Sequence, residues 1–294
     1  MALLSNILTQ VFITLIAVAG IYVLTGLTGM FSLGQAAFMA IGAYASGLLV
    51  VKAGFPFALA IVLAVILAVA VGYLIGFPTV RLRRDYISLV TLGFGEAIAA
   101  LLNRMTSLTG GASGLTGIPR RTSLLLAGIS AAVAVALVAM YKTSKYGRQC
   151  IAIRSDELAA KAMGVHVTRV KMTSFLLSVA LTAYSGCLYA AYLSYVDPTA
   201  FGWKKSADWV IMVFFGGVNS LSGSILGAFI LNALPQVLRG LENYRYVIYA
   251  VLVLIIINFK PSGLLGEWEL TPRNVKKLFR RNKTAQAKAK GGER

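Results

Sequence analysis

Residues 141–171 read YKTSKYGRQCIAIRSDELAAKAMGVHVTRVK, a polar and strongly basic stretch in an otherwise apolar chain, and the fold is organised around it. Its middle predicts a short helix. Ser155 can cap the first turn, the carboxylates of Asp156 and Glu157 suit the positive end of a helix dipole, and Gly164 supplies a left-handed stop. Such a short helix is unstable alone in water, so it needs a surface to dock on. We interpret it as a contact for a cytoplasmic partner; the alternative is a loop helix lying on its own membrane domain.

The composition predicts an all-α, polytopic helical membrane protein. Hydrophobic residues make up 58% of the chain and charged residues 13%, whereas soluble domains carry about a quarter charged residues. The net charge of +18 lies between and after apolar runs, which the positive-inside rule explains better than nucleic-acid binding does. Cys150 and Cys187 have no metal-ligand spacing and no reason to pair, so no metal site is expected. The first basic residue is Lys52, which argues against a cleaved signal peptide.

The apolar runs predict about 8–10 membrane segments, including short or re-entrant ones. They are residues 7–25, 36–51, 57–77, 86–102, 124–141, 172–193, 207–215, 224–238 and 246–259. We expect one transmembrane domain over residues 1–271, with a cytoplasmic segment at 142–171, and a basic, disordered tail at 272–294. With the amino terminus outside, the arginines of 81–84, the 142–171 segment and the tail all fall on the cytoplasmic side.

Two glycine-rich breaks interrupt the apolar pattern, at residues 26–35 (GLTGMFSLGQ) and 216–223 (GGVNSLSG). Transporters use such breaks to build unwound backbone that faces a pathway, and Gln35 and Asn219 are therefore candidate residues of a translocation pathway. The alternative is a tight turn between packed helices. A Ser-Leu pair occurs in both breaks, which hints at an internal repeat.

Glu96 lies inside the predicted span at 86–102, where a carboxyl group is costly unless it faces a cavity or a partner. It is a third candidate pathway residue; alternatively it bonds a neighbouring helix. The glycine-rich loop at 103–121 lacks the Gly-Lys-Ser/Thr ending of a phosphate loop, so no cofactor site is expected. His166 is the only histidine and has no nucleophile or ligand spacing, which disfavours an enzyme. A stand-alone secondary transporter would need an ion-coupling site, for which Glu96 is the clear candidate.

Three runs of sequence carry a family resemblance. They are GMFSLGQAAFMAIGAYASGLL (29–49), PTVRLRRDYISLVTLGFGEAIAALLNRMTSLTGGASGLTGIP (78–119) and YGRQCIAIRSDELAAKAMGVHVTRVKMTSFLLSVALTAYSGCLYA (146–190). They resemble the high-affinity branched-chain amino acid permeases of bacterial ATP-binding-cassette importers, and the M-type member more closely. The resemblance extends over residues 20–266. Some M-type relatives have a longer N-terminal membrane region, which this sequence lacks.

The resemblance implies a partner set and a mechanism. Members of the family pair with a second homologous permease above two cytoplasmic ATPase subunits, and an extracytoplasmic binding protein delivers leucine, isoleucine or valine. The permease lies in the bacterial inner membrane with a cytoplasmic C-terminus, and the ATP chemistry comes from the partner chains. Arg154, Glu157, Ala160 and Gly164 then match the family's cytoplasmic coupling segment. Because the family is related to sugar, nucleoside and urea permeases, another small solute is the alternative substrate.

Overall fold

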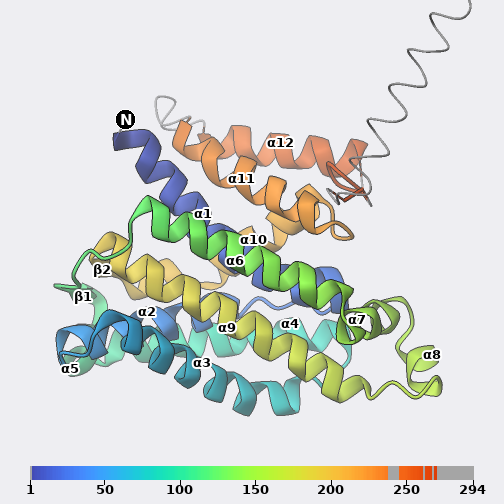
Figure 1. Cartoon of the computed structure of the whole chain (residues 1–294), viewed down its shortest axis with the longest axis horizontal. Helices are drawn as coiled ribbons and strands as arrows, with labels where there is room; N and C mark the ends of the chain where they lie inside the picture. The colour runs from blue at the N-terminus through green and yellow to red at the C-terminus, as the bar shows by residue number, and fades with distance from the viewer. Residues whose placement is uncertain (1, 238–244, 261, 267, 270–294) are drawn as a thin grey trace, which may run out of the picture.

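A computed structural model describes the chain except residues 1, 238–244, 261, 267 and 270–294 (Figure 1). The predicted basic tail at 272–294 lies outside the described residues. The elements are α1 (Ala2–Tyr22), η1 (Val23–Thr28, a π-helix), α2 (Gln35–Val51), α3 (Phe57–Thr79), α4 (Arg84–Arg104), α5 (Thr106–Thr109), η2 (Gly111–Ser113), β1 (Leu115–Thr116), α6 (Leu124–Thr143), α7 (Lys145–Ser155), α8 (Glu157–Ala162), α9 (Val167–Leu193), β2 (Tyr195–Val196), η3 (Pro198–Phe201), α10 (Trp203–Gly216), α11 (Leu221–Val237) and α12 (Arg245–Phe259).

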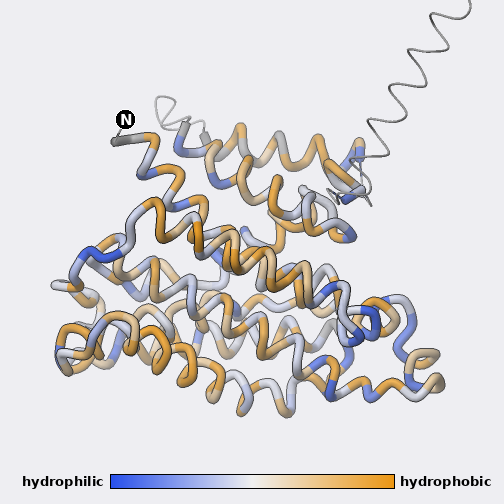
Figure 2. Tube along the Cα trace, in the orientation of Figure 1, coloured by the Kyte–Doolittle hydropathy of each residue, from blue (hydrophilic) through white to orange (hydrophobic). Residues whose placement is uncertain are grey.

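The all-α, polytopic membrane fold is confirmed, and each predicted segment appears as a helix. In the described part of the chain, 5 helical segments are long and apolar enough to cross a membrane. They are Leu4–Thr28, Phe57–Thr79, Tyr86–Arg104, Leu124–Thr143 and Val167–Leu193, and the apolar helices Gln35–Val51 and Leu221–Gln236 are shorter. Helices α3, α6 and α12 carry large apolar side chains on their outer faces, as expected for contact with lipid. Figure 2 shows the hydrophobic residues along the helices and many of the hydrophilic residues at their ends.

Helix α9 lies at the centre of the bundle, packed against α1, α2 and α3. Its contact with α2 depends on two glycines. A Cβ atom on Gly42 would lie 2.2 Å from the carbonyl oxygen of Ala183, and one on Gly186 would lie 2.0 Å from that of Met39. Small residues are what allows membrane helices to approach this closely.

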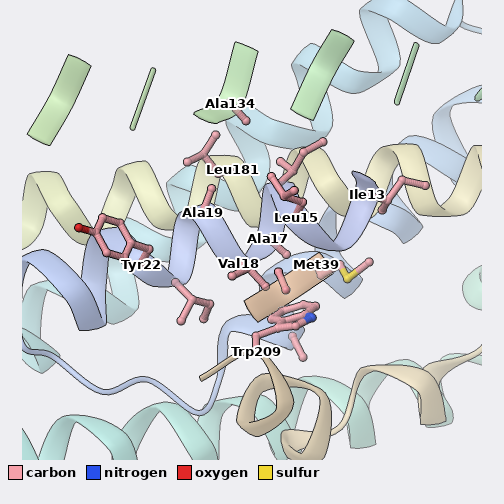
Figure 3. Close-up of a cluster of buried hydrophobic side chains, with 14 of the residues drawn as sticks. Ile13, Leu15, Ala17, Val18, Ala19, Tyr22, Met39, Ala134, Leu181 and Trp209 are labelled. Carbon is pink, nitrogen blue, oxygen red and sulfur yellow. The ribbon is translucent and has the colours of Figure 1, made fainter. Parts of the chain in front are cut away.

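Helix α1 supplies much of the remaining core, and its side chains point to several neighbours. Figure 3 shows Leu15 and Ala19 near Leu181 of α9 and Ala134 of α6, with Trp209 of α10 on the other side of α1. Helices α1, α6, α9 and α10 therefore share one hydrophobic core. Cys150 and Cys187 are both buried and unpaired, as their sequence context predicts.

The first glycine-rich break is unwound backbone, not a tight turn. Residues 29–34 have no regular structure, begin at Gly29 with a φ of 68°, and are mostly buried. The amide of Leu33 donates to Thr91 Oγ1 at 3.2 Å, and the amide of Ala36 donates to Ser206 Oγ at 2.8 Å. Side chains of α4 and α10 thus supply the hydrogen bonds that the irregular backbone needs inside the bundle.

The second break is a tight turn between α10 and α11. Gly217 has a φ of 122°, and Ser220 Oγ accepts the amide of Gly223 at 3.0 Å as a helix cap. The amides of Leu264 and Leu265 donate to the carbonyls of Phe215 and Gly216 at 2.9 and 3.1 Å. The two Ser-Leu pairs therefore sit in different structures: Ser220 caps α11, whereas buried Ser32 Oγ has no hydrogen-bond partner among the described residues.

Candidate functional site at the polar end of the bundle

The polar stretch forms two helices, α7 and α8, at one end of the bundle (Figure 1). Sequence reasoning missed α7 because it is only 11 residues long and basic residues lie between its apolar ones. Its start is well defined: Ser144 Oγ accepts the amide of Gly147 at 3.2 Å. Burial in the bundle of Cys150 and Ile153 holds α7 in place, and it raises the pKa of the Cys150 thiol.

The prediction that Ser155 caps the short helix is wrong. Ser155 is the last residue of α7, and its hydroxyl donates back to the Ile151 carbonyl at 3.1 Å. Asp156 is the cap instead: its Oδ1 accepts the amides of Leu158 and Ala159 at 2.8 and 3.0 Å. The predicted stop is confirmed, because Gly164 has a φ of 82°.

One side of α8 is fixed to the bundle. Ala160 is 5% exposed, and its carbonyl accepts the amide of Val165 at 3.1 Å. Both carboxylate oxygens of Glu157 accept from Lys171 Nζ at 2.7 Å, and the side chain of Lys171 is 1% exposed. Because a buried lysine needs a charged partner, this pair locks the first turn of α8 onto the start of α9.

Two large apolar side chains, one on α8 and one directly after its end, have no cover. Leu158 is 80% exposed and Met163 is 85% exposed. The helix is thus held from one side and leaves Leu158 and Met163 exposed, beyond the end of the bundle. This is the arrangement of a helix that seats in a groove of another protein.

Arg154, at the end of α7, reaches the first helix break. Its Nη1 donates to the carbonyl of Gly26 in η1. A π-helix exposes carbonyls that an α-helix would use internally, and these are often found at functional positions. The α7–α8 segment is therefore connected directly to the end of α1, just before the unwound residues 29–34.

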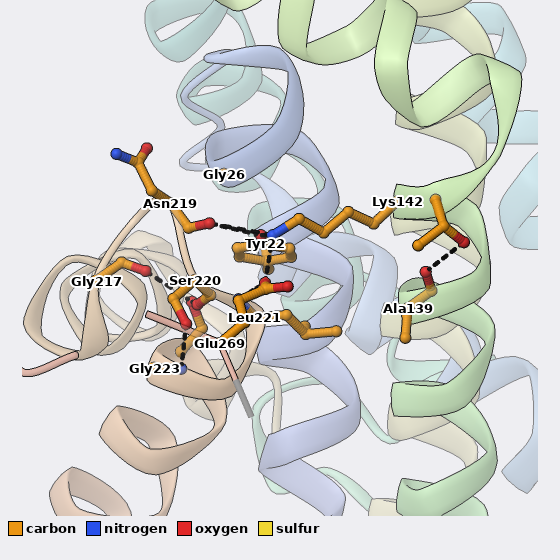
Figure 4. A network of polar contacts seen from close by, with 12 residues as sticks. Tyr22, Gly26, Ala139, Lys142, Gly217, Asn219, Ser220, Leu221, Gly223 and Glu269 are labelled. Atoms are coloured by element: carbon orange, nitrogen blue, oxygen red, sulfur yellow. Dashed lines mark hydrogen bonds and ion pairs between the residues drawn. The ribbon is translucent and has the colours of Figure 1, made fainter. Parts of the chain in front are cut away.

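A second network joins the same end of the bundle to the second break (Figure 4). Lys142 Nζ donates to Tyr22 Oη at 2.8 Å and to the Asn219 carbonyl at 3.1 Å, and it forms an ion pair with Glu269. Glu269 Oε1 also accepts the amide of Leu221, the first residue of α11, at 3.0 Å. Sequence reasoning missed Tyr22 and Glu269, because they are far from Lys142 in the chain.

The three candidate pathway residues differ in their surroundings. Gln35 is fully buried at the start of α2, where its Oε1 accepts from Thr182 at 3.4 Å and its Nε2 has no partner among the described residues. Glu96 is exposed on α4, and its Oε1 accepts the amide of Trp203 at 3.3 Å, at the positive end of α10. Asn219 follows the other end of α10, about 20 Å away at 1.5 Å per residue. The structure brings the backbones of Gln35 and Glu96 close together, since a Cβ atom on Gly95 would lie 3.4 Å from the Cα of Gly34, and it places Asn219 apart from Glu96.

Comparison with known proteins identifies the family. Residues 3–257 match a family model described as branched-chain amino acid transport system / permease component. The chain belongs to this permease family. The permease is 33% identical over 298 residues to the high-affinity branched-chain amino acid transport system permease protein LivM of Salmonella typhimurium, covering 88% of the permease and 69% of that relative. The resemblance predicted from the sequence is confirmed.

Two more distant relatives are also transport permeases. The permease is 27% identical over 139 residues to the permease protein LivH of Salmonella typhimurium, covering 46% of the permease and 44% of LivH. It is 26% identical over 253 residues to the fructose import permease protein FrcC of Rhizobium meliloti, covering 79% of the permease and 70% of FrcC. The permease is thus a multi-pass membrane protein whose relatives are transport permeases and not enzymes.

Proposed function

We propose that the permease is the transmembrane subunit of an ATP-binding-cassette importer and moves leucine, isoleucine and valine across the bacterial inner membrane. The observation that carries this proposal is helix α8, fixed to α9 by Glu157 and Lys171 while Leu158 and Met163 stand uncovered. Such a helix suits a groove on an ATPase subunit. The relationship to LivM supports the substrate class, because that protein belongs to a high-affinity branched-chain amino acid transport system.

The partner set follows from the same reasoning. Two ATPase subunits bind at the α7–α8 end, a second homologous permease pairs with this one, and an extracytoplasmic binding protein delivers the substrate. Similarity to both LivM and LivH supports pairing between two related permeases. The α7–α8 end also carries the basic residues that follow α3, so the positive-inside rule favours a cytoplasmic position for this end and for the C-terminus.

The two polar networks give coupling a physical route. When ATP closes the ATPase subunits, α8 moves with the groove that holds it, and α7 moves with α8. Arg154 then pulls on the Gly26 carbonyl beside the first break, and Lys142 acts on the Asn219 carbonyl beside the second. Both breaks are points where helices can change direction, so a small displacement at the cytoplasmic end alters the tilt of α2 and α11.

The test is the double substitution Leu158→Asp with Met163→Asp. Both side chains are exposed, so the permease should insert and melt as the wild type does, but two carboxylates in an apolar groove should abolish co-purification of the ATPase subunits. Lys145→Asp is the matched control, because it puts one carboxylate at the favourable start of α7. Normal recovery of ATPase activity with the double variant would contradict the proposal.

Substrate uptake separates the remaining alternatives. The relationship to FrcC makes fructose the specific competitor. We expect the reconstituted complex with its binding protein to take up labelled leucine and to ignore labelled fructose. Fructose uptake would keep the importer class and change the substrate. ATP-independent leucine uptake by this chain alone would instead indicate a secondary transporter.

A further inference from the structure

An open groove of about 1440 Å³ separates the end of α3 from α8 and the start of α9. Leu158 of the proposed coupling surface lines it on the α8 side, but that surface does not account for the basic residues around it. The wall nearest α8 is basic. Its cations are Arg81 and Arg83, which follow α3, Lys161 from α8, and Arg169 from the first turn of α9. Four cationic side chains from three segments therefore surround one space.

The ion pairs of the described residues, Lys142 with Glu269 and Lys171 with Glu157, do not include these four cations. Glu157 is the acidic residue among the lining side chains, and both of its oxygens are already taken by Lys171. Arg81 stacks over the ring of Phe77, with Cζ 4.2 Å from the ring centroid, which fixes it above the groove. The groove therefore carries a net positive charge that calls for an anion.

The lower wall is apolar and continuous with the outer face of the bundle. It includes Tyr73, Phe77 and Leu176, and the first two are large side chains about half exposed on α3. Tyr73 lies about 12 Å below Arg81, at 1.5 Å per residue along the helix. A molecule that fills the groove thus meets cations at one end and the hydrocarbon layer about 12 Å further in.

We propose that the groove binds an anionic phospholipid. Its phosphate lies among Arg81, Arg83, Lys161 and Arg169, and its acyl chains run down past Phe77 and Tyr73. A water-soluble peptide would leave the apolar wall facing lipid, whereas a diacyl phosphate matches both walls at once. Basic pockets between membrane helices are suited to anionic headgroups for this electrostatic reason. Such a lipid would brace the loop between α8 and α9, next to the proposed coupling helix.

The test compares lipid binding by full-length variants in detergent. Dioleoyl phosphatidylglycerol and dioleoyl phosphatidylcholine, which share their acyl chains, are titrated and bound lipid is counted by native mass spectrometry. We expect phosphatidylglycerol to bind more tightly, and Arg81→Gln with Arg169→Gln to weaken it on the order of tenfold. Arg120→Gln with Arg121→Gln is the matched control at the other end of the bundle. The basic residues of 273–294 are identical in every variant, so they do not affect the comparison.

A third variant distinguishes loss of positive charge from loss of folding as the cause of weaker lipid binding. Arg81→Lys with Arg169→Lys keeps both cations and should retain phosphatidylglycerol binding at a normal melting temperature. Equal binding of the two lipids, or an equal loss in the two glutamine variants, would overturn the proposal. So would displacement of bound phosphatidylglycerol by an ATPase subunit, because the groove would then be a protein interface. None of these readouts depends on the transported substrate.

Discussion

At some positions of this permease, the close approach of two helix backbones determines which residue type is tolerated. Gly42 and Gly186 each face a carbonyl of the neighbouring helix at a distance that no side chain tolerates. Gly93, by contrast, faces open space, because a Cβ added there would have no atom within 4 Å. Glycine is therefore required by close packing at Gly42 and Gly186, and no close contact requires it at Gly93.

The substitutions Gly42→Ala and Gly93→Ala should distinguish these two kinds of glycine. The added methyl would overlap the Ala183 carbonyl, so α2 and α9 must move apart, and we expect a loss of about 3 kcal/mol or more of unfolding free energy. Gly93→Ala should be neutral or stabilising by up to about 1 kcal/mol, because alanine is the better helix former. Thermal unfolding in detergent, followed by size-exclusion chromatography, measures both. Equal melting temperatures would mean that the α2–α9 contact is looser than the structure has it.

Glu96 has two possible roles, either to bond a neighbouring helix or to line the translocation pathway. Its contact with the Trp203 amide supports the interpretation that it bonds a neighbouring helix, and its exposure also leaves it accessible to a passing solute. Glu96→Gln keeps the accepting oxygen and removes the charge. If the carboxylate lines the pathway, as its position inside a membrane span predicts, leucine uptake should fall while the melting temperature stays within a few degrees. Unchanged uptake would leave Glu96 as a cap of α10 alone.

At the scale of elements, α8 depends on its stop as much as on its cap. Gly164 has a φ of 82° and open space around it, so a larger residue costs only the left-handed conformation, about 1–2 kcal/mol. That cost falls on α8 and its loop.

We expect Gly164→Leu to insert normally but to lose stimulation of ATP hydrolysis and uptake together. Gly54→Leu is the matched control. Gly54 has a φ of 68°, also faces open space, and lies between α2 and α3 at the other end of the bundle. Equal uptake by the two variants would mean that α8 tolerates a different ending and that its shape does not carry coupling.

The elements also show where sequence reasoning succeeds and where it stops. Long apolar runs made the membrane helices predictable, and a glycine after a short apolar helix made its end predictable. The cap was placed one residue early because Ser155 and Asp156 are both good caps, and only the extent of α7 decides between them. Helix α7 itself was missed, since it is only 11 residues long and basic residues lie between its apolar ones, so its apolar spacing was too short to stand out.

At the scale of the whole molecule, the polar end is connected through residues that no local pattern relates. Lys142 and Glu269 are 127 positions apart, and Arg154 and Gly26 are 128 apart. A lysine and an arginine in a basic stretch predict only the side of the membrane. The family resemblance placed Arg154 in the coupling segment, but its bond to the Gly26 carbonyl required the structure.

Arg154→Ala tests the connection across the molecule. The variant should still bind the ATPase subunits, because Leu158 and Met163 remain, yet leucine uptake should fall about tenfold or more as closure no longer reaches the first break. Arg148→Ala is the matched control: Arg148 donates to the Thr143 carbonyl at 2.8 Å, within the same turn of chain. Equal uptake by the two variants would remove Arg154 from the coupling route.

The ion pair between Lys142 and Glu269 also orders events during biosynthesis. Translation delivers α1 and α6 to the membrane long before Glu269 has been made. Until then, the ammonium group of Lys142 has no ion pair with Glu269. The turn between α10 and α11 is likewise open until residues 264–269 arrive to bond it. The end of the bundle that carries α7 and α8 is therefore completed after the other helices have inserted, and a nascent chain that stops before Glu269 lacks the carboxylate that joins Lys142 to the start of α11.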